Sequence, residues 1–455
     1  MPRAPFDPNT ATEAEIVAAA RTMHGHRLRD LVASRWTEKT SSSKSKGGAG
    51  SIVEKYFKIN QNSDTAPDFG AAGIELKTAP LIMDRRRGRR VKERTSISMI
   101  DYEALDGETW ATATVRKKLQ RILFVFYDWR PGVLLGDLRV VTTRVWSPSD
   151  ALLPYLERDW LAVWRKNHAG LAHKISERDG LALCARTKGS KGQTRVQPNS
   201  SELARPRAWA LKPSLTWVVY STQSADANEE IVRQLQREAP ADLVEAILRR
   251  VELLLGLTVS EVARRNNIVP GNGKSRVSAV IRGALGFRAR RLPPELEALS
   301  LELKTIPLGP DARPYEAMSF PAFDPLELAD EEWEDSDLNG RIQNMLLVPL
   351  FRERRKSNLT DQRVCRPFRW SPNERELDGI RSEWERCRRL VRQHRSNELP
   401  GEGETAYIHV RPHGRDKTDR VPVPGGQLLP RSCFWLNRDF VQSLVTANGR
   451  EWKGF

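Results

Sequence analysis

Pro67-Asp68 and Glu75-Leu76-Lys77 lie close together in the first part of this chain, and Pro294-Glu295 with Glu302-Leu303-Lys304 repeats the pattern far downstream. Alternate residues of a strand share a face, so Glu75 and Lys77 are expected to point to one side while Leu76 faces the core. Two carboxylates and a lysine at this spacing can hold a divalent cation beside a phosphate group. The same pattern also arises often by chance, and surface charge on a half-buried strand is its default explanation.

Further matched segments show that the whole chain is internally repeated. "GIELKTAPL" (73–81) matches "SLELKTIPL" (300–308), and Trp146-Ser147-Pro148 matches Trp370-Ser371-Pro372. Asp159-Trp160 and Glu383-Trp384 follow at the same distance in each copy, and Arg186 aligns with Arg411 further on. Similarity over nearly the full length predicts a tandem duplication of one α+β domain. We expect domains at residues 1–222 and 231–455, joined by a polar linker at residues 223–230.

Composition indicates a folded protein that binds a polyanion. The 455 residues include 39% hydrophobic residues and carry a net charge of +16, and the excess of cations favours nucleic acid or an acidic membrane as partner. No run of about 18 apolar residues occurs and no signal-peptide pattern opens the chain, so DNA or RNA in a bacterial cytoplasm is the preferred interpretation. The four cysteines form no CxxC pair, which favours reduced core thiols over a zinc site.

The segments "KGGAGSIVEKYF" (46–57) and "PDFGAAGIELKTAP" (67–80) resemble the MutH family of DNA endonucleases, which includes the mismatch-repair nickase and GATC-cutting type II restriction enzymes. The resemblance continues through residues 109–124 and 145–160, and returns in the second copy at residues 369–387, 407–414 and 434–445. It implies the PD-(D/E)xK nuclease core in each copy, a mixed sheet flanked by helices, and double-stranded DNA as substrate.

The resemblance also assigns the catalytic residues. The catalytic acids of the family fall on Glu54, Asp68 and Glu75, the catalytic lysine falls on Lys77, and a further active-site lysine falls on Lys118. Hard carboxylate oxygens suit Mg²⁺, so Asp68, Glu75 and Glu54 are the expected metal ligands. Lys77 would orient the attacking water and offset the charge that develops on the phosphate.

Several basic and aromatic residues are expected to contact DNA. The family's major-groove recognition arginine maps onto Arg411-Pro412 in the second copy and onto Arg186 in the first, where Thr187 replaces the proline and Lys188 follows. Arginine can bond O6 and N7 of guanine together. The aromatic residue near the adenine-methylation position aligns with Trp435 in the second copy but with Ala210 in the first. Arg85, Arg86 and Arg87 follow the first motif directly and are interpreted as DNA-backbone contacts, although such runs are commonly solvated loops.

The second copy lacks part of the catalytic set. Arg282 replaces Glu54, Glu295 replaces Asp68 and Arg341 replaces Lys118, while Glu302 and Lys304 remain. A cation in the place of a metal ligand repels a metal ion. We therefore expect the second domain to bind DNA without cutting it, as an effector domain or as a source of added affinity.

The leading hypothesis is a Mg²⁺-dependent type II restriction endonuclease that cuts GATC or a related site. A mismatch-repair nickase is the first alternative, although it needs only one copy of the domain, and a catalytically silent DNA-binding protein is the second. With one active site, either two chains dimerise on DNA or one chain nicks each strand in turn. A cognate DNA methyltransferase would act on the same site without direct contact.

Overall fold

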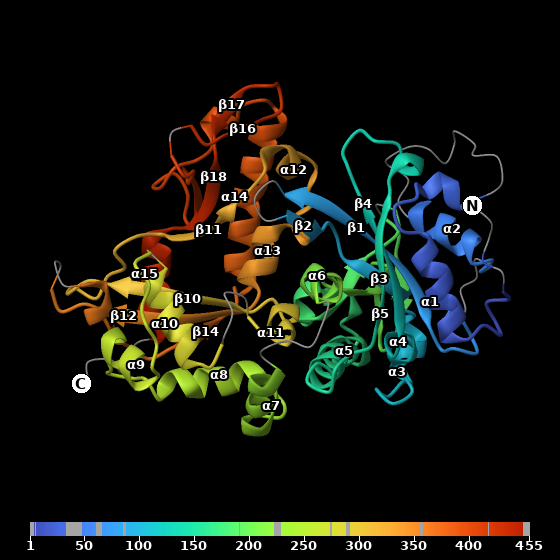
Figure 1. Cartoon of the computed structure of the whole chain (residues 1–455), viewed down its shortest axis with the longest axis horizontal. Coiled ribbons are helices and arrows are strands. Elements are labelled where there is room, and N and C mark those ends of the chain that lie inside the picture. The colour runs from blue at the N-terminus through green and yellow to red at the C-terminus, as the bar shows by residue number, and fades with distance from the viewer. Residues whose placement is uncertain are drawn as a thin grey trace. The chain divides into compact units, whose positions relative to one another are not determined.

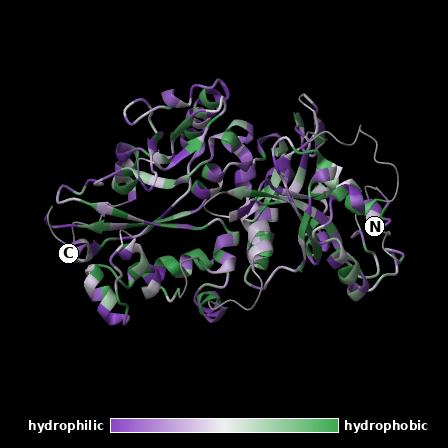
Figure 2. Ribbon diagram, turned by 45° about the horizontal axis from the view of Figure 1, so that its top comes forward, coloured by the Kyte–Doolittle hydropathy of each residue, from purple (hydrophilic) through white to green (hydrophobic). Residues whose placement is uncertain are grey.

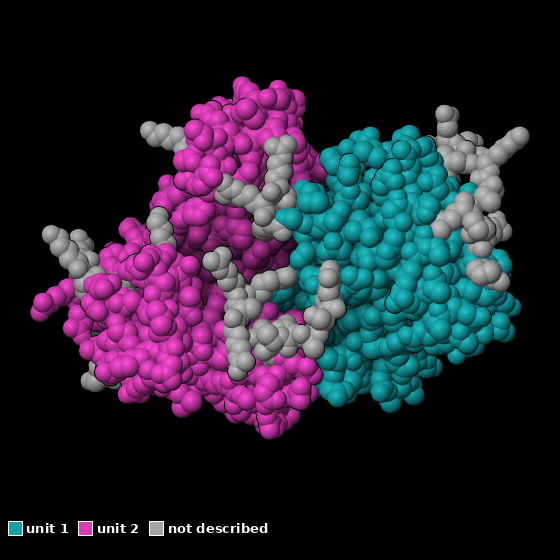
Figure 3. All heavy atoms as spheres, in the orientation of Figure 1, with its two compact units in different colours: residues 1–225, 297–299 teal, residues 226–296, 300–455 magenta. Residues whose placement is uncertain are grey.

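The computed structural model describes residues 4, 6–32, 48–60, 66–84, 88–190, 192–222, 229–273, 275–287, 292–354, 358–416 and 418–448. The chain forms two compact units, residues 1–225 with 297–299 and residues 226–296 with 300–455 (Figures 1 and 3). Helix α7 (Glu229–Glu238) contains the last two residues of the expected linker, and residues 223–228 lie outside the described ranges. Across those ranges no helix has the length and apolarity needed to cross a bilayer.

The main sheet of the first unit has the strand order β2-β1-β4-β5. Its strands are β2 (Gly88–Val91), β1 (Glu75–Asp84), β4 (Ile122–Asp128) and β5 (Val140–Trp146). β1 and β4 run parallel, whereas β2 and β5 run antiparallel to their neighbours. Every residue of β4 is buried, because an apolar strand inside a mixed sheet is covered on both faces.

Helices and a second, antiparallel sheet complete the first unit. Side chains of α1 (Glu13–Thr22) and α2 (Gly48–Tyr56) share a core with β1, β4 and β5. The second sheet has the order β3-β9-β6, and β7 pairs with β8 in a hairpin. The remaining elements are β3 (Thr95–Met99), α3 (Tyr102–Asp106), α4 (Thr114–Leu119), α5 (Leu153–His168), β6 (Leu183–Thr187), β7 (Arg195–Gln197), β8 (Ser200–Ala204), β9 (Arg207–Leu211) and α6 (Pro213–Ser221).

The second unit follows the same plan. Its main sheet has the order β10-β12-β13 with β14 also paired to β12, its second sheet has the order β11-β18-β15, and β16 pairs with β17. In both units hydrophobic residues concentrate along strands and on inner helix faces (Figure 2). The strands are β10 (Glu302–Leu308), β11 (Met318–Ala322), β12 (Met345–Phe351), β13 (Arg363–Val364), β14 (Phe368–Trp370), β15 (Ile408–Pro412), β16 (Arg420–Pro422), β17 (Leu428–Pro430) and β18 (Ser432–Leu436). The helices after α7 are α8 (Leu243–Glu252), α9 (Val259–Arg265), α10 (Arg276–Ala284), α11 (Pro294–Ala298), α12 (Pro325–Asp330), α13 (Asp337–Ile342), α14 (Glu374–Arg392) and α15 (Arg438–Asn448).

Strand register places the residues that match in sequence at corresponding positions of the two units. Ile122 lies between Glu75 and Trp146 in the first main sheet, and Met345 lies between Glu302 and Trp370 in the second. In the smaller sheets, Leu211 pairs with both Leu183 and Thr95, whereas Leu436 pairs with both Ile408 and Met318. The four cysteines are buried and form no disulfides, in agreement with the expectation of reduced core thiols.

One carboxylate in each unit anchors a long helix to the second sheet. Asp159 Oδ2 on α5 accepts hydrogen bonds from the backbone N–H groups of Leu181, Ala182 and Leu183 at 2.9, 2.7 and 3.0 Å. Glu383 on α14 accepts from the backbone N–H groups of Ala406, Tyr407 and Ile408 in the same way. Gly180 permits this close approach, because a Cβ there would lie 1.8 Å from Leu183 O and 2.9 Å from Asp159 Cβ.

We predict that Asp159→Ala destabilises the first unit by about 3 kcal/mol, because it leaves buried N–H groups without an acceptor. Glu383→Ala is the matched variant in the second unit, and its effect should be smaller, since Ala406 is exposed and water can replace the lost acceptor. Urea unfolding and amide hydrogen exchange at residues 181–183 measure both effects. Equal losses for the two variants would contradict the role of burial.

Candidate functional site

Glu75 is the buried centre of the candidate site in the first unit. It opens β1 and is only 1% exposed. Lys77 Nζ donates to its Oε1 at 2.6 Å, and Lys118 Nζ, from α4, donates to Oε1 and Oε2 at 3.2 and 3.0 Å. Lys118 is itself buried. Two ammonium groups therefore offset the cost of removing this carboxylate from water, and the pairing joins β1 to α4.

Asp68 lies directly beside this cluster. Its Oδ2 accepts a hydrogen bond from the backbone N–H of Leu76 at 2.9 Å, so its carboxylate is fixed at the residue that follows Glu75. The structure thus brings together four of the five residues expected at the catalytic site: Asp68, Glu75, Lys77 and Lys118.

Glu54 is the fifth residue expected at the catalytic site. It lies on α2, and a Cβ placed on Gly50 of that helix would be 3.7 Å from Thr78 Oγ1 and 3.8 Å from Glu54 Oε1. Helix α2 therefore packs on the face of β1 that carries Thr78, whereas Glu75 and Lys77 belong to the alternate face. No group of three His, Cys, Asp or Glu residues that could hold a metal ion occurs in the described ranges.

The donor set at Asp68 and Glu75 is nevertheless suited to Mg²⁺. This ion prefers oxygen ligands, keeps several waters, and is commonly held by one or two carboxylates together with substrate phosphates. A closed protein cage of three or more acids is not required for it. Asp68 and Glu75 are the residues that could hold the ion, while the ammonium groups of Lys77 and Lys118 limit the net negative charge there.

The corresponding position in the second unit has more positive charge. Arg341 Nη1, from α13, donates to Glu302 Oε1 and Oε2 at 3.2 and 3.0 Å, and its Nε donates to Asp337 Oδ2 at 3.0 Å. Burial opposes the charge on Arg341, but Asp337 and Glu302 more than offset burial and raise its pKa. Lys304 Nζ is 3.7 Å from Glu302 Oε1 and donates to the carbonyl of Ser319 at 3.0 Å.

The additional cations of the second unit affect the pKa of Lys304. Burial lowers the pKa of Lys304, and the nearby charges of Arg341 and Arg282 lower it further, while Glu302 opposes the shift. Arg282 lies on α10 and Glu295 on the short helix α11. The charges of Arg341 and Lys304 next to Glu302, with Arg282 near Lys304, oppose the binding of a divalent cation at this position.

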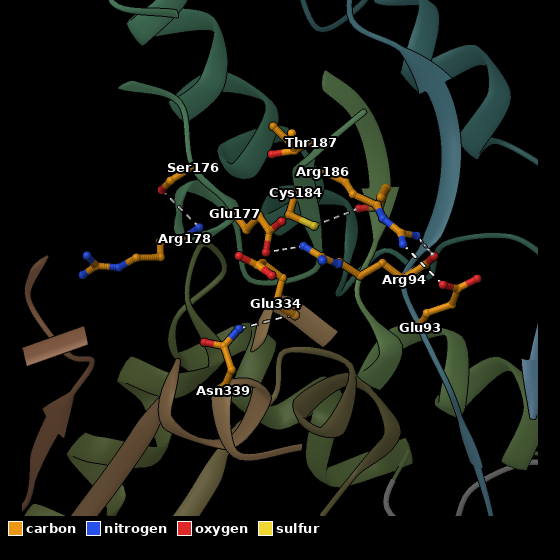
Figure 4. A network of polar contacts seen from close by, with 12 residues as sticks. Glu93, Arg94, Ser176, Glu177, Arg178, Cys184, Arg186, Thr187, Glu334 and Asn339 are labelled. Carbon is orange, nitrogen blue, oxygen red and sulfur yellow. Dashed lines mark hydrogen bonds and ion pairs between the residues drawn. The ribbon is translucent and has the colours of Figure 1, made fainter. Parts of the chain in front are cut away.

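The expected DNA-reading arginines are both engaged by glutamates. Arg186 on β6 donates from Nη1 to Arg94 O at 2.9 Å and from Nη2 to Glu93 Oε2 at 3.3 Å, while Arg94 forms an ion pair with Glu177 (Figure 4). Arg411 on β15 forms an ion pair with Glu402 and lies 5.7 Å above the Trp435 ring.

The other expected DNA contacts lie around these strands or outside the described residues. Lys188 follows β6, and its backbone N–H donates to Pro206 O; Pro412 ends β15. Arg85, Arg86 and Arg87 lie outside the described ranges. Sequence reasoning missed Glu93, Glu177 and Glu402, and only the equal distance of Glu177 and Glu402 from their strands could have pointed to a pair.

Comparison with known proteins identifies relatives of both units. Residues 57–159 and 290–383 match the family described as DNA mismatch repair enzyme MutH. The chain is 23% identical over 456 residues to the type II restriction enzyme Sau3AI of Staphylococcus aureus, covering 89% of this chain and 93% of that protein. It is 30% identical over 211 residues to the DNA mismatch repair protein MutH of Salmonella paratyphi B, covering 45% of this chain and 90% of that protein. The corresponding protein of Shewanella baltica is 28% identical over 210 residues.

We predict that Lys118→Met destabilises the first unit by about 2 kcal/mol, because the buried Glu75 carboxylate keeps only Lys77 as a partner. Lys118→Arg should restore most of the loss, since Arg341 makes the equivalent bonds to Glu302 in the second unit. Chemical denaturation of the two variants provides the measurement. If the Lys118→Met variant were as stable as the parent, Lys77 alone would be sufficient to stabilise the buried Glu75 carboxylate.

Proposed function

Because the chain belongs to the MutH family, we propose that it is a type II restriction endonuclease that cuts both strands of DNA at GATC or a related short sequence. One observation carries the proposal: the first unit holds the buried Glu75 between Lys77 and Lys118, next to Asp68. The similarity to a type II restriction enzyme along 89% of the chain supports the two-unit arrangement over a single-unit nickase.

The first unit, proposed as residues 1–222, would contain the active site. Asp68 and Glu75 would hold Mg²⁺, which polarises a scissile phosphate and lowers the pKa of a bound water. Lys77 Nζ would orient that water and stabilise the negative charge that develops on the phosphate. Lys118 is a positioning residue, because it fixes the Glu75 carboxylate through both oxygens. Glu54, on α2, would complete the site either as a direct ligand or by holding the residues that bind the ion.

The second unit, proposed as residues 231–455, would bind DNA without cutting it. Arg341 ties up Glu302 and Asp337, and Lys304 donates to a backbone carbonyl in place of the glutamate. Matching register in both sheets supports an origin by duplication of one PD-(D/E)xK domain. The additional DNA site would serve as an effector site or add affinity.

One catalytic unit per chain must still cleave two strands. Two chains could meet on the duplex, or one chain could nick each strand in turn. A cognate methyltransferase would protect the same sequence in a host cell without contacting this protein.

The proposal is tested by incubating the purified chain and Mg²⁺ with unmethylated and adenine-methylated plasmid, and by sequencing the DNA ends. Discrete double-strand breaks at one short sequence are the expected result. Nicks alone would favour a mismatch-repair nickase, and binding without any cleavage would identify a DNA-binding protein with a silent site.

We predict that Asp68→Ala and Lys77→Ala each reduce the cleavage rate by a factor on the order of a thousand, because each removes a group that acts on the reacting phosphate. DNA binding in Ca²⁺ should persist in both variants. Lys304→Ala is the matched control, and it should cut at nearly the parental rate. Cleavage by the Lys77→Ala variant, or its loss in Lys304→Ala, would show that the active site is assigned to the wrong unit.

A further inference from the structure

Arg186 on β6 and Arg411 on β15 occupy corresponding positions, but they have different hydrogen-bond and ion-pair partners. Arg186 binds the Arg94 carbonyl and Glu93, and its side chain is 17% exposed. Arg411 binds Glu402, and its side chain is 40% exposed. Register makes the two arginines equivalent, since Leu183 pairs with Leu211 and Ile408 pairs with Leu436, each at the start of its strand.

The loss of one neighbouring arginine explains the change of partner. Thr95 pairs with Leu211 and Met318 pairs with Leu436, so the residue before each, Arg94 or Ala317, also corresponds. Glu177 and Glu402 precede their strands by the same number of residues. In the first unit Glu177 is taken by Arg94 (Figure 4). In the second unit Ala317 offers no cation, and Glu402 pairs with Arg411 instead.

Glu402 therefore occupies the Nη2 donor of Arg411, a residue whose position is suited to contact DNA. Arg411 lies 5.7 Å above the ring of Trp435, and His413 meets the same ring at 5.4 Å in an edge-on arrangement. The guanidinium can donate two parallel hydrogen bonds to a phosphate or to a guanine edge. Glu402 accepts from Nη2 of Arg411, so either ligand must displace the carboxylate before it can use that donor.

We propose that Glu402 is an internal competitor for DNA at Arg411, and that it sets the DNA affinity of the second unit. The inference rests on the proposed function, in which this unit binds DNA. The side chain of Glu402 is 36% exposed and that of Arg411 is 40% exposed, and a pair at such exposure contributes little to stability. DNA can therefore displace the carboxylate, so Glu402 lowers affinity without blocking binding.

The test uses the full chain carrying Lys77→Ala, in EDTA, with a fluorescent GATC duplex and a duplex of equal length that lacks GATC. Anisotropy titrations give the Kd. Adding Glu402→Gln should lower the Kd about fivefold, because DNA no longer has to displace a carboxylate from Arg411. Glu404→Gln is the matched control: it makes the same change of charge two residues away, where Glu404 lies 3.7 Å from Arg386.

A second series of variants, which also carries Arg411→Gln, distinguishes competition for Arg411 from a general effect of the change in net charge. With Arg411→Gln present, adding Glu402→Gln should give no further gain in affinity. Equal gains from Glu402→Gln and Glu404→Gln, or a gain that persists with Arg411→Gln, would overturn the inference. An unchanged Kd in the Glu402→Gln variant would overturn it as well, while leaving the proposed function intact. Failure of the parent chain to bind either duplex would overturn the proposed function and the inference together.

Discussion

A carboxylate at the first residue of β1 or β10 organises each unit, fully buried as Glu75 in the first and partly exposed as Glu302 in the second. Glu75 is almost fully removed from water, and a charge at such a position persists only where cations and hydrogen bonds replace the lost solvation. Lys118 and Lys77 supply both, so β1, α4 and the functional side chains are fixed by one set of contacts. Glu302 and Arg341 join β10 to α13 in the same manner. Charged contacts therefore stabilise these strand–helix junctions in addition to the apolar core.

Arg341 stands in the second unit where Lys118 stands in the first. This difference changes the hydrogen-bond partner of the neighbouring lysine, Lys304. An ammonium group concentrates its charge on one atom, whereas a planar guanidinium presents several N–H groups in fixed directions. Arg341 uses them to bind Asp337 in addition to Glu302. Lys304 then lies 3.7 Å from Glu302 and donates to Ser319 O, whereas Lys77 donates to Glu75 at 2.6 Å. The same Glu-x-Lys motif therefore holds its lysine against the carboxylate in one unit and against the backbone in the other.

Local patterns in the sequence were sufficient to predict the elements that carry the motif. Alternation around Glu75-Leu76-Lys77 indicated a strand, and β1 begins at Glu75. Side-chain partners were harder to predict, because they depend on residues distant in sequence. The Glu93 and Glu402 contacts fall in this class. Glu54 was expected beside the other acids, and it lies on α2, close to the Thr78 side of β1. A helical period locates a residue on its helix but does not select the strand face that the helix covers.

The anchor carboxylates hold the strands that carry Arg186 and Arg411, β6 and β15. Asp159 and Glu383 each hold the backbone just before or at the start of β6 and β15, immediately after the segments that carry Glu177 and Glu402. Glu177 and Glu402 therefore lie at corresponding positions in the two units, although their ion-pair partners differ. With the backbone held in common, one exchange of Arg94 for Ala317 is enough to redirect a carboxylate from a buried arginine to an exposed one. The two units can therefore differ without a change of fold. A substitution changes only which of the neighbouring charged residues form an ion pair.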